Sequence, residues 1–151
     1  MSGSFEAAEG ACARCPSCNK EIPAGPALPS AESPCPHCGG PLWFLHVEVG
    51  DVLIVRFSPG RILKEGEFQQ IREFLFARDP HPRVVLNLDH CQYFSDTTLA
   101  GFIVLYKKLT EARGRLKICC LRPPMSDVFK LARLDQLFDI YDDEKSALAS
   151  F

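Results

Sequence analysis

The sequence lacks the long apolar run that a membrane-spanning helix requires. Within its 151 residues there is no stretch of about eighteen consecutive apolar side chains. The opening segment, MSGSFEAAEGACARC, has neither a basic start nor an apolar core of the kind that directs export. We therefore expect a cytoplasmic protein with no membrane partner.

A surplus of charge of one sign is also missing. The formal net charge is −2, with two basic and four acidic side chains in residues 1–40 and fifteen of each in the remainder. Domains that bind nucleic acid usually present a basic surface, so we expect no nucleic acid partner. One basic group is interrupted by Glu111 and has no interleaved aromatic residues, which indicates a solvated helix face. Its members are Lys107, Lys108, Arg113, Arg115 and Lys117.

Candidate catalytic groups are few and poorly arranged. His90 and Cys91 are neighbours, and in an extended chain neighbouring side chains point to opposite faces. Cys119 and Cys120 fall in an expected buried strand, where cysteine acts as a small apolar side chain. We therefore expect no enzymatic activity and no small-molecule substrate.

Cysteine, by contrast, is abundant: the chain has eight, and five of them precede residue 40. Four form two C-x-x-C pairs, Cys15-Pro-Ser-Cys18 and Cys35-Pro-His-Cys38, with sixteen residues between the pairs. This spacing is typical of a four-thiolate zinc site, and a chain without an export signal favours metal binding over disulfides.

The residues that follow the two C-x-x-C pairs agree with a metal site. Asn19 and Gly39 are the residue types that best tolerate the left-handed backbone conformation needed to complete such a turn. Residues 12–41 thus resemble a zinc ribbon, preceded by a disordered tail at 1–11. Four thiolates close the coordination sphere, so we expect a structural zinc ion. Metal-free thiols and a redox pair are the alternatives, and Cys12 could replace Cys15.

From residue 42 the pattern changes to alternating strands and helices, which predicts an α/β fold with a mixed sheet and helices packed against it. A hairpin is expected within 43–60, turning at Gly50-Asp51. Further strands are expected at 83–88, 115–121 and 138–141. Helices are expected at 63–79, where Pro80 and Pro82 end the first one, and at 97–114, 125–134 and 142–151. Gly114 is expected at a helix C-terminal cap.

From about residue 45 to the end, the chain resembles the STAS domain of bacterial anti-sigma-factor antagonists. The resemblance rests on GDVLIVRF, VVLNLDHCQYFSD, LYKKLTEARGRL and, most specifically, LARLDQLFDIYDDEKSAL. It implies a STAS-like domain over residues 42–151 that pairs with an anti-sigma factor, an ATP-binding serine kinase. It also implies a loop serine whose phosphorylation breaks this pairing.

The family loop reads Asp-Ser-Ser-Gly-Leu-Gly, and its acceptor serine follows the Asp. One alignment matches Asp96 to the family Asp, which makes Thr97 the acceptor and Thr98 the second hydroxyl but puts Leu99 where Gly is usual. The other has no gap and is better supported. It matches Ser95 to the Asp, Asp96 to the acceptor, Thr97 to the second serine and Thr98 to the Gly.

In the gapless alignment the acceptor position carries a permanent carboxylate. An aspartate supplies one charge where phosphate brings about −1.5 to −2, so Asp96 would be a partial mimic. Capping alone would also select these residue types before an apolar helix. The loop Ser95–Thr98 is therefore a phosphoswitch at Thr97 or Thr98, a fixed mimic, or only a helix cap.

The segment after this loop, LAGFIVLY, is more apolar than one buried helix face requires. We expect Leu99, Phe102 and Tyr106 to contact the partner, with burial under a neighbouring helix as the alternative. The leading hypothesis is a partner-switching regulator. The alternative is a constitutive zinc-ribbon and STAS adaptor in a transcription or transport assembly that is not phosphoregulated.

Overall fold

A computed structural model gives the architecture of the chain. It describes residues 14–16, 18–20, 35, 37–40, 44–57, 65–89, 95–123 and 125–151. The expected disordered tail at 1–11, the spare Cys12 and the pair His90 and Cys91 lie outside these residues.

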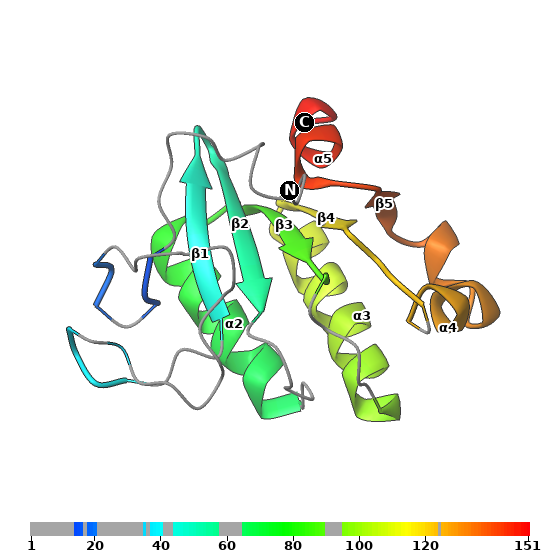
Figure 1. Ribbon diagram of the computed structural model, residues 1–151, viewed down its shortest axis with the longest axis horizontal. Coiled ribbons are helices and arrows are strands. Elements are labelled where there is room, and N and C mark those ends of the chain that lie inside the picture. Colours follow the sequence, from blue (N-terminus) through cyan, green and yellow to red (C-terminus); the bar gives the residue numbers. More distant parts are fainter. Residues whose placement is uncertain are drawn as a thin grey trace.

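A five-stranded mixed sheet forms the centre, with strand order β1-β2-β3-β4-β5 (Figure 1). β1 runs antiparallel to β2, and β2, β3, β4 and β5 follow one another in parallel. The strands are β1 Phe44–Val49, β2 Val52–Phe57, β3 Arg83–Asn87, β4 Arg115–Cys119 and β5 Asp139–Tyr141. The expected hairpin turn is confirmed, and Gly50 supplies its positive φ of 59°.

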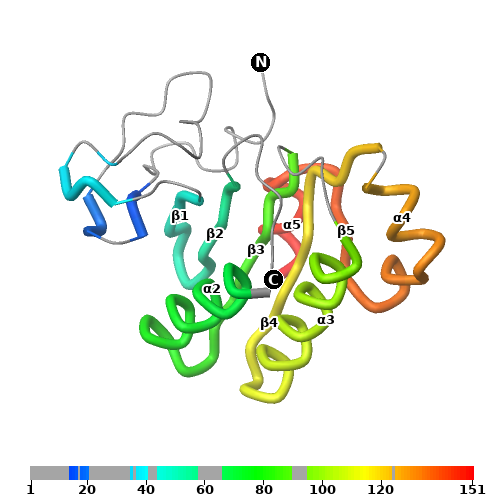
Figure 2. Tube along the Cα trace, turned by 90° about the horizontal axis from the view of Figure 1, so that it is seen from below, coloured from blue at the N-terminus to red at the C-terminus, as the bar shows by residue number. Residues whose placement is uncertain are grey.

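Helices cover both faces of this sheet. α2 and α3 lie on one face and α5 lies on the other, where it contacts β3, β4 and β5 (Figure 2). The helices are α2 Glu65–Arg78, α3 Asp96–Glu111, α4 Met125–Leu131, a 3-10 helix at Leu134–Gln136, and α5 Glu144–Ala149. The expected α/β class, with helices packed against a mixed sheet, is confirmed.

The alternation of strand side chains produces two apolar layers. Val55, Leu86 and Ile118 are fully buried toward α2 and α3, while Ile54 and Val85 are fully buried toward α5. A buried aromatic row lies under the helices. The rings of Phe68 and Phe102 are 4.9 Å apart, and those of Phe102 and Phe129 are 5.9 Å apart.

Gly114 belongs to the C-terminal capping motif of α3, as expected, although it is not the left-handed residue of that motif. The left-handed residue is Arg113, with φ of 62°, and its N–H donates to the Thr110 carbonyl. Gly114 follows it and donates its N–H to the Leu109 carbonyl at 2.7 Å, which completes a Schellman motif. Glycine is needed there for another reason, because a Cβ would collide with the carbonyl oxygen of Pro82.

Candidate functional site

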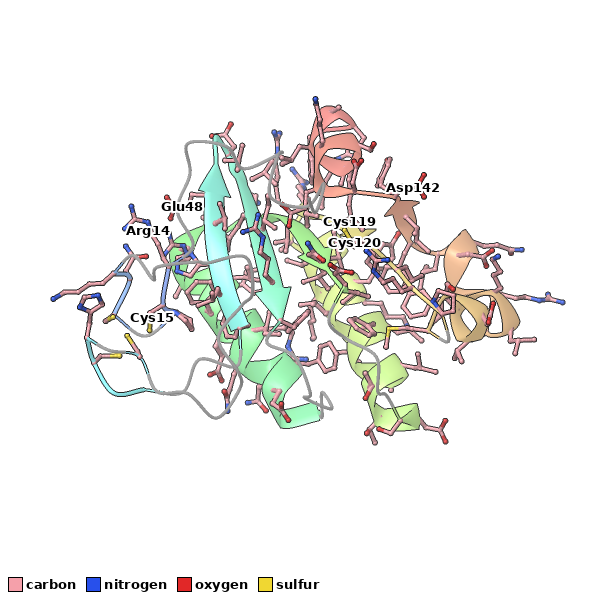
Figure 3. The ribbon with its side chains drawn as sticks, viewed as in Figure 1. Arg14, Cys15, Glu48, Cys119, Cys120 and Asp142 are labelled. Atoms are coloured by element: carbon pink, nitrogen blue, oxygen red, sulfur yellow. The ribbon has the colours of Figure 1, made fainter. Side chains whose placement is uncertain are left out.

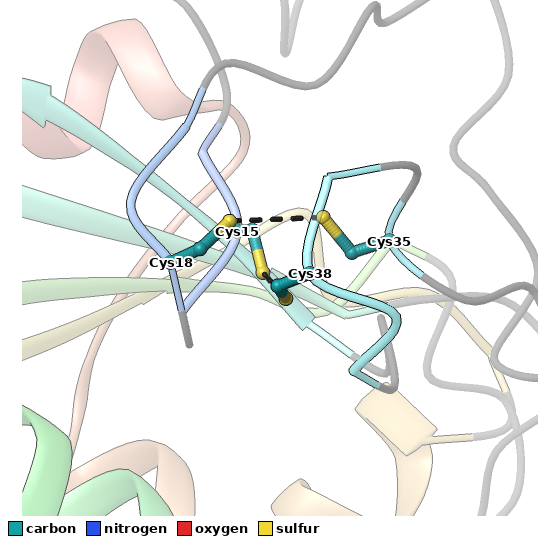
Figure 4. A group of neighbouring side chains, drawn as sticks. All are labelled: Cys15, Cys18, Cys35 and Cys38. Atoms are coloured by element: carbon teal, nitrogen blue, oxygen red, sulfur yellow. Dashed lines mark hydrogen bonds between the residues drawn. The ribbon is translucent and has the colours of Figure 1, made fainter.

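The four expected zinc ligands lie together. All four sulfur atoms are within 4.8 Å of one another (Figure 4). The Sγ atoms of Cys15 and Cys38 are 3.8 Å apart, and those of Cys18 and Cys35 are 3.7 Å apart. A tetrahedron with Zn–S bonds of about 2.3 Å has edges of about 3.8 Å, so the spacing of the sulfurs suits a four-coordinate metal ion.

The two C-x-x-C turns have the same backbone geometry. Asn19 and Gly39 adopt φ of 62° and 74°, so the left-handed conformation predicted for both residues is confirmed. The Asn19 N–H donates to the Cys15 carbonyl at 2.9 Å, and the Gly39 N–H donates to the Cys35 carbonyl at the same distance. The repeated turn explains how pairs so far apart in the sequence direct their sulfurs at one point.

Backbone N–H groups also point at two of the four sulfur atoms. The N–H of His37 lies 3.4 Å from Cys35 Sγ, and the N–H of Gly40 lies 3.4 Å from Cys38 Sγ. Burial raises the pKa of Cys35, but hydrogen bonds from the backbone of Cys38 and His37 outweigh it and lower the pKa to about 6. The thiolate is the form that binds metal.

Next to the first C-x-x-C turn, Arg14 forms an antiparallel backbone bridge with His46, on the side of β1 that faces away from β2 (Figure 3). The Arg14 N–H donates to the His46 carbonyl at 2.8 Å, and the His46 N–H donates to the Arg14 carbonyl at 3.2 Å. Cys15 and Cys35 belong to the same buried cluster as Leu45. The described residues between 14 and 40, here called the cysteine segment, therefore cover part of an edge strand. The sequence did not predict this contact.

A buried histidine lies beside this junction. The His46 side chain is inaccessible, and neither ring nitrogen has a hydrogen-bond partner among the described residues. Its ring centroid is 4.8 Å from that of Phe74. Burial, and then the charge of Arg78, lower the pKa of His46 to about 4, although the backbone of Cys15 opposes the shift. The imidazole is thus neutral near pH 7.

The expected switch loop lies at the N-terminal end of α3. Ser95 is the N-cap residue, and its backbone N–H donates to Thr98 Oγ1 at 3.1 Å. Ser95 Oγ lies 2.7 Å from Thr97 Oγ1. Ser95, Asp96 and Thr97 are exposed, whereas Thr98 is buried. Of the two candidate phosphoacceptors, only the Thr97 hydroxyl therefore lies on the surface.

The apolar residues of α3 divide between core and surface. Leu99 and Tyr106 are half-buried, and the Tyr106 ring packs on Phe138 with centroids 5.2 Å apart. The expectation for Phe102 is corrected, because its side chain is completely buried among core aromatic rings. Val104 is 39% exposed. The sequence could not tell these residues apart, since it does not say which faces of α3 its neighbours cover.

A small cavity lies next to the loop. Its volume is about 170 Å³, and it includes Thr97 and Gly101 of α3 together with Phe68 and Arg72 of α2. Because residue 101 lacks a side chain, α2 and α3 approach closely at this point. Arg72 supplies the cationic group of the cavity, and nothing in the sequence pattern singled it out.

A buried polar network was also missed. Arg56 of β2 donates two hydrogen bonds to Glu144 of α5, and Asn87 of β3 donates a third. All three side chains are buried. Their positions are far apart in the sequence, so no local pattern could have joined them.

Across the described ranges, no helix has the length and apolar character of a membrane span. The family model of the STAS domain matches residues 47–147.

Two curated relatives match a shorter part of the chain. BtrV of Bordetella bronchiseptica, named as a candidate anti-sigma factor antagonist, is 30% identical over 69 residues, which are 46% of this chain. An anti-sigma F factor antagonist of Paenibacillus polymyxa is 28% identical over 65 residues, or 43% of this chain. The matches span 60% and 56% of the lengths of these relatives.

Solved structures share the fold. An anti-sigma-factor antagonist (STAS) domain protein from Planctomyces limnophilus aligns with a TM-score of 0.58 and 20% identity, covering 71% of this chain and 96% of the other. A Thermotoga maritima protein with a crystal structure aligns with a TM-score of 0.58 and 18% identity, covering 71% of this chain and 92% of that one.

Proposed function

This chain belongs to the STAS domain family, and from that premise we propose that it is a regulatory binding protein of the anti-sigma-factor-antagonist type. Its partner is an anti-sigma factor with serine kinase character, and it docks through the N-terminal end of α3. The names of the two curated relatives support this class of partner. The protein works by binding rather than by catalysis, in the cytoplasm, and without nucleic acid, membrane or small-molecule substrate.

The exposure of the loop is the observation that carries the docking proposal. Ser95, Asp96 and Thr97 present two hydroxyls and a carboxylate to solvent at a helix N-terminus. Half-buried Leu99 and the cavity beside Thr97 provide apolar surface next to these polar groups. A partner that covers this end would bury both kinds of group, which makes its affinity sensitive to added charge.

The chemistry of the loop supports Thr97 as the residue where a phosphate would act. Its hydroxyl is exposed, and a phosphate there would add about −1.5 to −2 charges beside the carboxylate of Asp96. A docked partner would then have to desolvate two adjacent like charges, which favours release. In the gapless alignment Asp96 itself supplies part of this effect permanently.

We further propose that Cys15, Cys18, Cys35 and Cys38 hold a structural zinc ion. The spacing of the sulfurs, the repeated turns and the N–H groups directed at them support a tetrahedral thiolate site. Zinc would contribute folding energy to a segment with little apolar surface of its own. Four sulfur ligands leave no coordination position for a substrate.

Binding measurements on three variants test the docking proposal. The full chain would be used to capture partners from native cytosol, and the retained serine kinase would then be titrated by calorimetry. Thr97→Glu should weaken binding by at least about tenfold, because it adds a second carboxylate beside Asp96. Asp96→Ser should strengthen binding if Asp96 acts as a fixed mimic. Thr110→Glu, an exposed position at the far end of α3, is the matched control.

The outcomes separate the two candidate functions. A one-to-one complex with a serine kinase that Thr97→Glu disrupts and Thr110→Glu preserves would support the partner-switching regulator. Retention of one non-kinase assembly by all variants would contradict it, and the chain would then be a constitutive adaptor whose loop is only a helix cap.

A further inference from the structure

The C-terminal helix α5 is linked to the end of β3 by a chain of hydrogen bonds that starts at a buried carboxylate. Glu144 is the first residue of α5, and its side chain is completely buried. Glu144 Oε1 accepts from Arg56 Nη2 at 2.7 Å, and Oε2 accepts from Arg56 Nε at 2.8 Å and from Asn87 Nδ2 at 2.6 Å. One carboxylate thus holds a side chain from each of two neighbouring strands.

The chain continues from Asn87 to the segment that follows β3. Asn87 Oδ1 accepts the backbone N–H of Asp89 at 2.9 Å. The Asp89 carboxylate in turn pairs with Arg122, in the segment after β4, and the Leu88 N–H donates to the Cys119 carbonyl at 3.1 Å. The described contacts end at Asp89, and residues 90–94 separate it in the sequence from Ser95.

The carboxylate of Glu144 determines which way the Asn87 amide faces. A carboxylate can only accept hydrogen bonds, so the NH₂ group of Asn87 must point toward Glu144. The amide oxygen then necessarily points toward the Asp89 N–H. A side chain at position 144 that also donates would allow the opposite orientation, in which two donors face each other at Asp89.

The burial of this ion pair argues for positioning more than for stability. A buried, well-bonded ion pair often contributes no more to stability than apolar residues of similar volume, because desolvating both charges offsets their attraction. The bidentate pair with Arg56 holds the Glu144 carboxylate in the core. The direction of the Asn87 amide is set by the carboxylate itself, because a carboxylate only accepts hydrogen bonds.

The register of the sheet places this network at the C-terminal ends of the parallel strands. Arg56 lies opposite Asn87 in the β2–β3 pair, and Asn87 lies opposite Cys119 in the β3–β4 pair. Asn87 and Cys119 are the last residues of their strands. The network therefore spans the edge where the parallel strands end, which is the edge from which the chain proceeds to α3.

We infer that Glu144 is a positioning residue for the end of β3: through Asn87 it fixes the backbone at Asp89, so α5 determines the backbone conformation directly after this strand. The inference about Asp89 stands without any partner. The consequence for docking rests on the proposed function. If the partner docks at α3 as proposed, its affinity depends on α5, which lies on the opposite face of the sheet.

Amide hydrogen exchange on the full chain, followed by NMR, tests this inference. In Glu144→Gln the Asn87 amide can reverse, so the Asp89 amide should exchange about five- to tenfold faster relative to Val85, a buried neighbour in β3. Asn87→Ala removes the acceptor directly and should have the same effect if Glu144→Gln does not fold. Arg56→Lys is the control, because it weakens the anchoring of α5 but leaves the bond between Glu144 and Asn87.

A purely structural role makes a different prediction for these variants. It would lower the thermal midpoint and accelerate Val85 and Asp89 equally in Glu144→Gln and in Arg56→Lys, which would overturn the inference. An unchanged Asp89 exchange rate in Asn87→Ala would also overturn it. Because exchange at Asp89 requires no partner, a failure of the docking proposal would leave these results intact, and partner affinity would be measured separately.

Discussion

Adding one methyl group at Gly101 tests how α2 and α3 are held together beneath the loop. In Gly101→Ala the new Cβ would lie 2.5 Å from Cε2 and 2.7 Å from Cγ of Phe68, and closer still to Cδ2. Phe68 is completely buried, and the Phe102 ring packs against it with centroids 4.9 Å apart. The Phe68 ring therefore has little room to retreat.

Two opposing effects decide the magnitude. Alanine is better than glycine inside a helix by about 1 kcal/mol. Forcing an extra methyl group into a packed core costs about 1–3 kcal/mol, and the short distances to a confined ring favour the upper part of that range. The net expectation is a loss of about 1–2 kcal/mol. For a chain of 151 residues, each kcal/mol lowers Tm by about 2–4 °C.

Urea and thermal unfolding of the full chain would measure this difference, and the chain offers a matched control. Gly66 lies in α2, and a Cβ added there meets nothing within 4 Å. Gly66→Ala should therefore be neutral or more stable, by up to about 1 kcal/mol. A double variant with Phe68→Leu should recover part of the loss in Gly101→Ala, because the shorter side chain vacates the contact.

The packing argument would be refuted if Gly101→Ala proved as stable as Gly66→Ala. The same conclusion would follow if the Phe68→Leu substitution simply added its own destabilisation. Either result would mean that α2 and α3 separate easily, and that their close approach does not depend on the missing side chain at position 101.

Two further predictions concern the cysteine cluster and the cap of α5. The purified chain should carry about one zinc ion by mass spectrometry under native conditions, Cys35→Ser should lose it, and Cys119→Ser, at a buried thiol in β4, should keep it. The hydrogen bonds from Ser146 hold the pKa of Asp143 below its usual value of 3.8, so the charged cap stabilises the fold above that pH and the contribution disappears as pH falls through the lowered pKa. The difference in unfolding free energy between wild type and Asp143→Ala should therefore be constant from pH 5 to 7 and become smaller below about pH 4. A difference that grows on acidification would contradict this explanation.

Local features were the predictable part of the structure. The hairpin turn at Gly50 and the left-handed conformations of Asn19 and Gly39 depend on short segments, so residue type and spacing were sufficient. The alternation of strands and helices was also predictable, because each element buries one face against the sheet.

Features that depend on distant residues were not predictable. Gly114 lies in the C-terminal capping motif of α3 as predicted, but the close approach of the Pro82 carbonyl, which excludes a Cβ there, could not be predicted. The burial of Phe102 depends on α2 and α4, and the pairing of Arg56 with Glu144 joins positions 88 residues apart. In each case the decisive contact comes from a part of the chain that a local pattern does not include.

The backbone bridge between Arg14 and His46 limits where a truncated form of the protein can begin. The family match starts at residue 47, which lies inside β1, so a fragment begun there would lose half of the strand that pairs with β2. Beginning at Phe44 would keep β1 but remove the backbone partner that Arg14 provides and the cysteine side chains that pack on Leu45. An uncovered strand of this kind pairs readily with other chains. The cysteine segment is therefore better regarded as the outer border of the sheet than as a separable attachment.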